Sequence, residues 1–138
     1  SRATRKGLVR ACHDCSEGGL AVAAAEMSFA GGLGMELSLE GVPAEGWPDH
    51  AQQRVRGEDT LLFSESNSRF LVEVRPQMAG AFEKVLRGIP YGLLGRVKKE
   101  PIFIIKDRRG RAIVREKIYG LKEAWQSPLS ALTASKSA

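Results

Sequence analysis

Two segments of the chain alternate between apolar and polar residues, which is the pattern of a half-buried strand. In the first segment, Met35, Leu37 and Leu39 are separated by charged or hydroxyl side chains. The second segment, residues 69–75 (RFLVEVR), is the clearest strand signal in the chain, and Pro76 stops it because proline has no N–H to donate. Both segments are therefore predicted to be strands.

Two other segments predict helices. Residues 20–30 (LAVAAAEMSFA) contain no glycine or proline and are apolar almost all round, so this helix should be buried on most sides. The glycines at positions 31, 32 and 34 should end it, because glycine adopts the positive φ of a C-terminal cap at little cost. Residues 77–87 place apolar side chains at helical spacing, which predicts an amphipathic helix with Gly88 as its cap.

Shorter signals complete the order of elements. The chain should open with the tail of a helix that is broken at Gly7 and then approach a strand. Residues 61–63 lead into a polar loop. We further predict a short polar helix at residues 49–55 and a weaker strand at residues 91–97. A hairpin should follow, with strands at residues 102–106 and 112–115 around the loop 107–111. A short helix at residues 120–126 should close the fold.

This order of elements favours an α/β (α+β) fold, in which a mixed sheet of about four to six strands has helices packed on its faces. The strand–helix–strand unit over residues 69–97 should cross over with a right hand. We assign residues 1–129 to one domain. Residues 130–138 are small and polar, and we expect them to form a flexible C-terminal tail.

The composition fits one globular domain. Of 138 residues, 43% are apolar and 27% are charged, which excludes a large multidomain enzyme, a disordered protein and a membrane span. No export signal is visible and two cysteines do not make a disulfide framework, so we expect a cytoplasmic protein without a membrane partner. Because the chain begins with Ser1 and not Met, we expect it to be a piece of a longer polypeptide.

The net charge of +5 is unevenly distributed. Through Arg69 there are seven basic and ten acidic residues, whereas from Phe70 onward there are 14 basic and six acidic residues. A basic cluster can attract phosphates or an acidic partner surface, but it also fits the solvated face of a hairpin. Few aromatic residues interleave with it, so no nucleic-acid partner is expected. The cluster consists of Lys98, Lys99, Lys106, Arg108, Arg109, Arg111, Arg115 and Lys117.

A glycine-containing polar segment, CHDCSEGGL at residues 12–20, precedes the first long helix. Such a loop presents backbone N–H groups and the positive end of the helix dipole to an anion, so Ser16, Gly18 and Gly19 are candidate phosphate ligands. Asp14 is the candidate metal ligand, because a carboxylate beside a phosphate can share a Mg²⁺ with it. The alternative is an ordinary capped helix, in which Asp14 or Ser16 accepts N–H bonds and the glycines allow close packing.

The same segment contains a Cys-x-x-Cys pair, Cys12 and Cys15. A redox function would need a thiolate favoured at a helix start, but this helix begins several residues further on. A structural zinc site would need two ligand pairs at suitable spacing, which Cys12, Cys15, His13 and His50 do not form. Two ordinary buried thiols are the simplest interpretation.

A second polar segment, SESNSR at residues 64–69, lies between apolar runs. Its hydroxyls, carboxylate and guanidinium can hydrogen-bond a sugar phosphate, which makes Ser64, Glu65, Ser66 and Arg69 candidate ligands. The alternative is a turn rich in bonds between side chains and the backbone. No catalytic triad can be assigned, since a triad depends on spatial neighbours.

Three motifs in order along the chain resemble the C-terminal end of the phosphoribosylformylglycinamidine synthases of purine biosynthesis. They are HDCSEGGLAVAAAEMSFAGGLGMEL, LLFSESNSRFLVEV and KEAWQSPL, and the match runs from about residue 7 to residue 129. This family is related to aminoimidazole ribonucleotide synthase. The resemblance implies a fold like the C-terminal domain of that enzyme, which is partly ferredoxin-like.

The resemblance also implies a function. Enzymes of this family are ATP-dependent ligases that convert formylglycinamide ribonucleotide and glutamine-derived ammonia to formylglycinamidine ribonucleotide, with ATP and Mg²⁺ as cofactors. The implied partners are the N-terminal-type domains of the same synthetase, a glutaminase subunit and a small accessory subunit. By motif, Asp14 matches an acidic residue that helps to hold Mg²⁺, Gly18 and Gly19 match the glycine-rich turn, and Glu65 and Ser66 match a loop that contacts substrate.

The chain resembles the second of two C-terminal-type domains in the synthetase, whose site in the family is an auxiliary nucleotide site or a structural remnant. The catalytic histidine and most ATP contacts belong to other domains, so no catalytic residue is assigned here. Several hundred residues are expected to precede this segment, and the 138 residues alone should be inactive. Two other functions remain open: a structural module that binds subunits but no ligand, and a small thiol oxidoreductase that uses Cys12 and Cys15.

Overall fold

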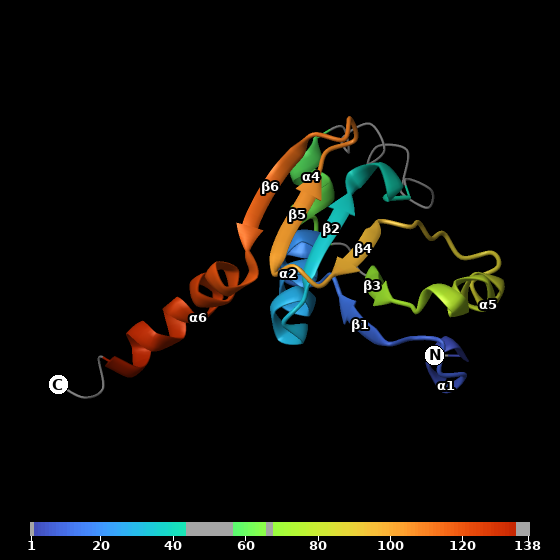
Figure 1. Cartoon of the computed structure of the whole chain (residues 1–138), viewed down its shortest axis with the longest axis horizontal. Helices are drawn as coiled ribbons and strands as arrows, with labels where there is room; N and C mark the ends of the chain where they lie inside the picture. Colours follow the sequence, from blue (N-terminus) through green and yellow to red (C-terminus); the bar gives the residue numbers. More distant parts are fainter. Residues whose placement is uncertain (1, 44–56, 66–67, 135–138) are drawn as a thin grey trace.

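The computed structural model describes residues 2–43, 57–65 and 68–134 (Figure 1). The described elements are, in chain order, α1 (Arg2–Arg5), β1 (Ala11–Asp14), α2 (Gly19–Gly31), β2 (Gly34–Ser38), the 3₁₀ turn η1 (Leu39–Gly41), α4 (Glu58–Phe63), β3 (Phe70–Glu73), the 3₁₀ turn η2 (Pro76–Met78), α5 (Ala79–Val85), β4 (Gly95–Lys98), β5 (Ile102–Lys106), β6 (Ala112–Lys117) and α6 (Ile118–Ala134). None of the described helices is long and apolar enough to cross a membrane.

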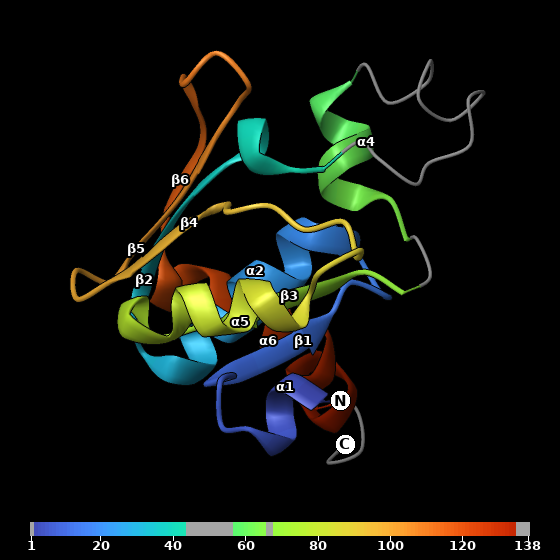
Figure 2. The same ribbon diagram turned by 90° about the vertical axis from the view of Figure 1, so that its right-hand side faces the viewer.

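A four-stranded mixed sheet forms the centre of the molecule, as the pattern predicts. Its strand order is β4-β2-β5-β6, with β2 and β5 parallel and the other pairs antiparallel. Helices α2 and α6 lie on one side of this sheet (Figure 2). The alternation along β2 and β5 sends every second side chain into the core against α2. The core residues from these elements are Leu20, Ala23, Ala24, Met35, Leu37, Phe103, Ile105 and Ile118.

The predicted strand–helix–strand crossover over residues 69–97 is wrong. β3 does not join the four-stranded sheet but pairs antiparallel with β1 in a separate two-stranded sheet. β4 starts only at Gly95 and pairs antiparallel with β2. The physical reason is that the clearest strand signal finds its partner in the N-terminal segment, a pairing that local periodicity does not reveal.

Two predictions that concern helices also need correction here. Residues 61–63, predicted to lead into a loop, belong to the helix α4, which spans Glu58–Phe63. Helix α5 ends at Val85 with Leu86 as its cap, and Gly88 lies beyond it with a φ of 84°. The short helix predicted at residues 49–55 lies outside the described residues. By contrast, Gly32 caps α2 with a φ of 65°, which confirms the predicted end of that helix.

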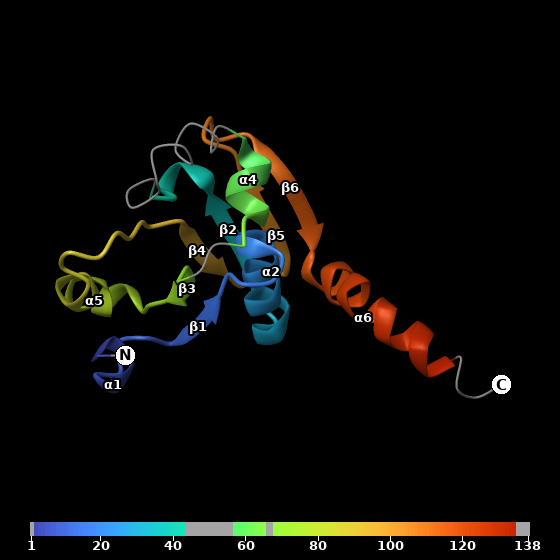
Figure 3. The ribbon, with the colours of Figure 1, turned by 180° about the vertical axis from the view of Figure 1, so that it is seen from behind.

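The closing helix was predicted to end before Ser127, but α6 continues to Ala134. Pro128 lacks the N–H that would normally donate to the carbonyl of Ala124. The Ser127 hydroxyl donates to that same carbonyl at 3.0 Å, so the acceptor stays satisfied and the helix continues. Helix α6 extends away from the sheet, as Figure 3 shows from behind.

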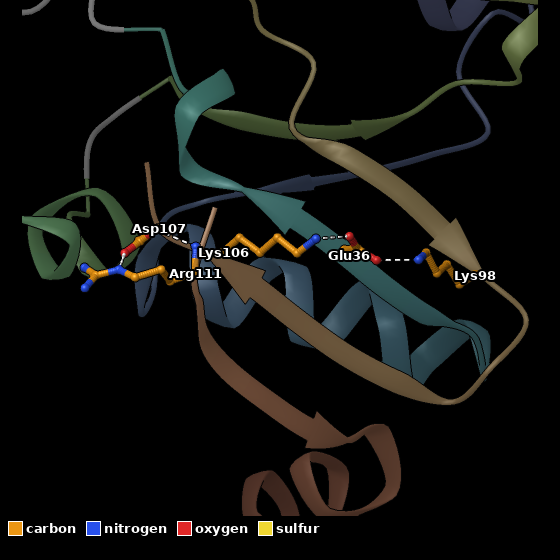
Figure 4. Close-up of polar contacts among 5 residues, drawn as sticks. All are labelled: Glu36, Lys98, Lys106, Asp107 and Arg111. Carbon is orange, nitrogen blue, oxygen red and sulfur yellow. Dashed lines mark hydrogen bonds and ion pairs between the residues drawn. The ribbon is translucent and has the colours of Figure 1, made fainter. Parts of the chain in front are cut away.

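The predicted hairpin of β5 and β6 is confirmed, and a buried carboxylate organises its turn (Figure 4). Asp107 accepts the backbone N–H groups of Arg109 and Arg111, each at 2.8 Å, and the side-chain Nε of Arg111 at 2.6 Å. Burial alone would raise the pKa of Asp107, but these hydrogen bonds outweigh it and hold the pKa below its usual value. Arg111 from the basic cluster therefore has a structural partner.

Candidate phosphate-binding site

The turn between β1 and α2 adopts a conformation that requires glycine. Gly18 and Gly19 have φ values of 69° and 66°, in the left-handed region that other residues rarely adopt. Gly18 is the N-cap of α2, and no side chain caps the helix. The alternative in which Asp14 or Ser16 caps this helix is thus not what the structure shows.

Asp14 ends β1 with an exposed side chain, 58% accessible to solvent. The Ser16 hydroxyl donates to its carboxylate, and this hydrogen bond is the main reason why the pKa of Asp14 lies below its usual value. The carboxylate is therefore ionised at neutral pH. An exposed, negatively charged carboxylate at the end of β1 is accessible to a cation.

The described residues of the two polar segments identified in the sequence lie side by side. In the β1–β3 pair, Asp14 is directly opposite Phe70, and the backbone N–H of Cys15 donates to the carbonyl of Arg69 at 3.0 Å. Next to this pair, the backbone N–H of Gly18 donates to the Glu65 carboxylate at 3.0 Å. Two loops that are 47 positions apart along the chain are thus joined at one end of the small sheet.

Gly19 also fits a close approach between helices. A Cβ atom at this position would lie 2.6 Å from the carbonyl oxygen of Leu62 and 2.8 Å from the carbonyl carbon of Phe63. The start of α2 therefore touches the backbone of α4 directly. At Gly19, the structure shows the close packing that the alternative interpretation of the glycines predicted.

Arg69, predicted to bind phosphate, extends toward the end of α4. Its guanidinium donates to the carbonyls of Leu61 and Ser64, each at 3.2 Å. The carbonyls of a last helical turn have no partner within the helix, so this charged group satisfies them. Ser64 sits at the C-cap of α4, and Ser66 lies outside the described residues.

We expect Arg69→Ala to destabilise the chain by about 1–3 kcal/mol, because it removes hydrogen bonds from a charged group to two carbonyls. Arg69→Lys should restore little of this loss, since one ammonium cannot reproduce the fork of a guanidinium. Urea denaturation of both variants measures the effect, with Arg75→Ala at an exposed position as the control. Equal stability of the Arg69 and Arg75 variants would show that these two bonds contribute nothing.

Sequence reasoning did not single out the pair formed by His13 and Glu26. The Nε2 atom of His13 lies 2.7 Å from the Glu26 carboxylate, and its Nδ1 atom lies 2.7 Å from the backbone carbonyl of Asp14. This pair ties the strand that carries Asp14 to α2. The available signal was Glu26 itself, the one charged residue within a helix that is otherwise apolar almost all round.

The environment of Cys15 does not favour a reactive thiol. Cys15 is buried, and its burial raises the pKa of the thiol, whereas a reactive thiol needs a lowered pKa. Both cysteines are free, but Cys12 is exposed, so the expectation of two buried thiols is wrong for Cys12. Cys15 therefore lacks the lowered pKa that the thiol oxidoreductase alternative would require of it.

Within the described residues, no group of three His, Cys, Asp or Glu side chains could hold a metal ion by itself. Mg²⁺ often needs fewer protein ligands than three, because it commonly binds one or two carboxylates, substrate phosphates and several waters. A single exposed and ionised carboxylate, such as that of Asp14, fits a Mg²⁺ that is shared with a phosphate.

The fold and the site together define a mixed-sheet α+β domain in which a glycine turn opens a buried helix beside a second polar loop. Residues 1–108 match the family described as AIR synthase related protein, C-terminal domain. The chain belongs to this family.

Full-length relatives and solved structures agree with this assignment. The chain is 38% identical over 93% of its length to the phosphoribosylformylglycinamidine synthase subunit PurL of Deinococcus radiodurans, and 38% identical over 91% to that of Synechocystis. It spans only 16% and 15% of these relatives. The PurL of T. maritima complexed with ATP matches 86% of the chain with a TM-score of 0.71 and 26% identity, where the chain covers 19% of that protein. E. coli HypE shares the fold, with a TM-score of 0.61 over 79% of the chain and 34% of HypE, at 19% identity.

Proposed function

We propose that this chain works as the C-terminal domain of a phosphoribosylformylglycinamidine synthase, the ATP-dependent ligase that forms formylglycinamidine ribonucleotide in purine biosynthesis. The observation that carries the proposal is the junction of the two polar loops through the Cys15–Arg69 and Gly18–Glu65 hydrogen bonds. The similarity to PurL proteins, some solved with ATP or FGAR, supports it. The enzyme would work in the cytoplasm.

The role of this domain would be to border a nucleotide or phosphate pocket and not to carry out the chemistry. Enzymes that transfer phosphoryl groups work mainly by positioning and charge neutralisation, so a domain can contribute one metal ligand and a few donors. Asp14 would hold a Mg²⁺, which would neutralise phosphate charge when bound. The phosphate and substrate contacts would come from Ser16, Gly18, Gly19, Ser64, Glu65, Ser66 and Arg69.

The pocket would be completed by other parts of the enzyme. The proposed partners are the N-terminal-type domains of the same synthetase, the glutaminase subunit that supplies ammonia, and the small accessory subunit. Gly18 donates its N–H to Glu65, so a bound phosphate would either replace this carboxylate or use neighbouring donors. In the ligand-free domain, the Glu65 carboxylate would hold the two loops together through its hydrogen bond with the N–H of Gly18.

Titration with Mg²⁺ and ADP, using the chain joined to its preceding domain, tests the proposal. We expect Asp14→Asn to weaken Mg²⁺ADP binding at least about tenfold, because a neutral amide replaces the metal ligand. Glu83→Gln removes an exposed carboxylate on α5 and is the matched control, expected to bind normally. Removing Mg²⁺ with EDTA should abolish the difference between Asp14→Asn and the unaltered chain.

Equal affinity of the Asp14→Asn and Glu83→Gln variants for Mg²⁺ADP would contradict the proposed metal ligand. Absence of any nucleotide binding would favour the second candidate, a structural module that contacts other domains or subunits. One observation favours that candidate: Glu65 and Arg69 both make hydrogen bonds within the chain. An assembly defect in an Arg69→Ala enzyme with unaltered nucleotide affinity would support it further.

A further inference from the structure

The four-stranded sheet has one face that no described helix covers (Figure 2). We call it the outer face and define it by the row Arg96, Glu36, Ile104 and Arg115. These four residues are register partners across β4, β2, β5 and β6, so their side chains project from the same side of the sheet. Helix α2 lies behind the strands when Glu36 is viewed from the front (Figure 4).

Positive charge dominates the outer face. By strand alternation, Lys98, Lys106 and Lys117 project from the same side as Arg96 and Arg115. Glu36 is the one carboxylate among the described strand residues of this face. These strands therefore present five cations against one anion, which is a strong local excess for an area of four short strands.

Glu36 does not balance this excess, because two lysines already share its carboxylate. Lys106 lies 2.6 Å from one oxygen and Lys98 forms an ion pair with the other. Hydrogen bonds from Lys106 and Lys98 lower the pKa of Glu36 to about 2, so it stays ionised at neutral pH. Arg96, Arg115 and Lys117 form no ion pair with any residue that the structure describes.

The centre of the outer face is apolar. Ile102 and Ile104 occupy the positions of β5 where a solvated sheet face normally carries polar side chains, and both are half-buried. In the register, Ile104 lies between Glu36 and Arg115, and Ile102 is opposite Lys117. Two apolar side chains flanked by long charged ones resemble a protein interface, with its apolar centre and polar rim. A sheet face that only contacts water would normally carry polar side chains at positions 102 and 104.

We propose that the outer face binds an acidic protein surface that carries apolar side chains opposite Ile102 and Ile104. Charge complementarity selects this occupant, because Arg96, Arg115 and Lys117, which have no ion-pair partner in the described part of the chain, attract carboxylates and repel a second copy of the same face. No aromatic side chain from the described strands projects from this face to stack on bases, which disfavours a single-stranded nucleic acid. The proposal is independent of nucleotide binding.

The test uses two labelled peptides of equal length and charge, one of alternating Glu and Leu and one of alternating Glu and Ser. Their binding to the whole chain is followed by fluorescence anisotropy at two salt concentrations. Oligo(dT) and phosphatidylcholine vesicles with phosphatidylserine are the competing probes. We expect the Glu-Leu peptide to bind more tightly than the Glu-Ser peptide, and added salt to weaken both.

The decisive variant is Arg96→Gln with Arg115→Gln and Lys117→Gln, which should weaken Glu-Leu binding at least about tenfold. The control combines Arg5→Gln, Lys6→Gln and Lys84→Gln, which removes the same charge from exposed positions away from the sheet. We expect the control to change binding less than about threefold. If the first variant unfolds, Arg96→Gln alone, on the edge strand β4, should still weaken binding measurably.

Three results would overturn the proposal. One is no binding of the Glu-Leu peptide to the unaltered chain. Another is an equal loss in the sheet variant and the control variant, which would mean that only net charge matters. The third is binding of oligo(dT) or anionic vesicles that depends on the outer face while peptide binding does not, which would assign the face to nucleic acid or to lipid.

Discussion

Replacing Gly19 by alanine should destabilise the chain by about 2–4 kcal/mol. Two separate causes contribute. The φ of 66° is unfavourable for any residue with a Cβ atom, and that Cβ would lie 2.6 Å from the carbonyl oxygen of Leu62. The obstacle is backbone, which cannot rotate away as a flexible side chain can. Either α2 or α4 must therefore shift.

Gly31→Ala is the matched control for Gly19→Ala. It lies at the other end of α2, has no positive φ, and a Cβ there would meet nothing within 4 Å. Urea denaturation should show a large fall in the free energy of unfolding for Gly19→Ala and almost none for Gly31→Ala. A loss below about 0.5 kcal/mol at Gly19 would mean that the two helices do not touch as described.

Phe103→Ala should cost about 3–5 kcal/mol, the largest loss that we expect from a single substitution in this chain. Phe103 is 2% exposed on β5, which lies between β2 and β6. It packs in the same core as Met35 and Leu37 of β2 and the start of α2. Removing the ring leaves a cavity that the surrounding strands and helix can only partly fill.

Ile104→Ala is the control for Phe103→Ala, because the next residue on β5 projects from the outer face of the sheet. We expect it to cost less than about 2 kcal/mol, since Ile104 is only half-buried. Thermal unfolding monitored by circular dichroism compares the two variants. If Ile104→Ala were the more damaging change, the assignment of the two sheet faces would be reversed.

The candidate site was predictable in parts. The residue types at 14–19 and 64–69 indicated two polar loops near a helix start, and the structure joins described residues of the two loops, Gly18 with Glu65 and Cys15 with Arg69. The Gly18–Glu65 hydrogen bond and the orientation of Arg69 toward α4 were not predictable. Both depend on where β3 lies, and sequence periodicity says nothing about the partner of a strand.

The sequence by itself determined the local elements of this protein: the buried helix α2 and its cap at Gly32, the alternating strands β2 and β3, and the hairpin of β5 and β6. Such features follow from propensity, glycine geometry and the spacing of apolar residues, which all act within a few positions. Tertiary structure alone decided that β3 pairs with β1, and that Glu26 meets His13. It also decided that Arg96, Glu36, Ile104 and Arg115 align on one face, because each of these contacts joins segments whose meeting depends on the packing of the whole chain.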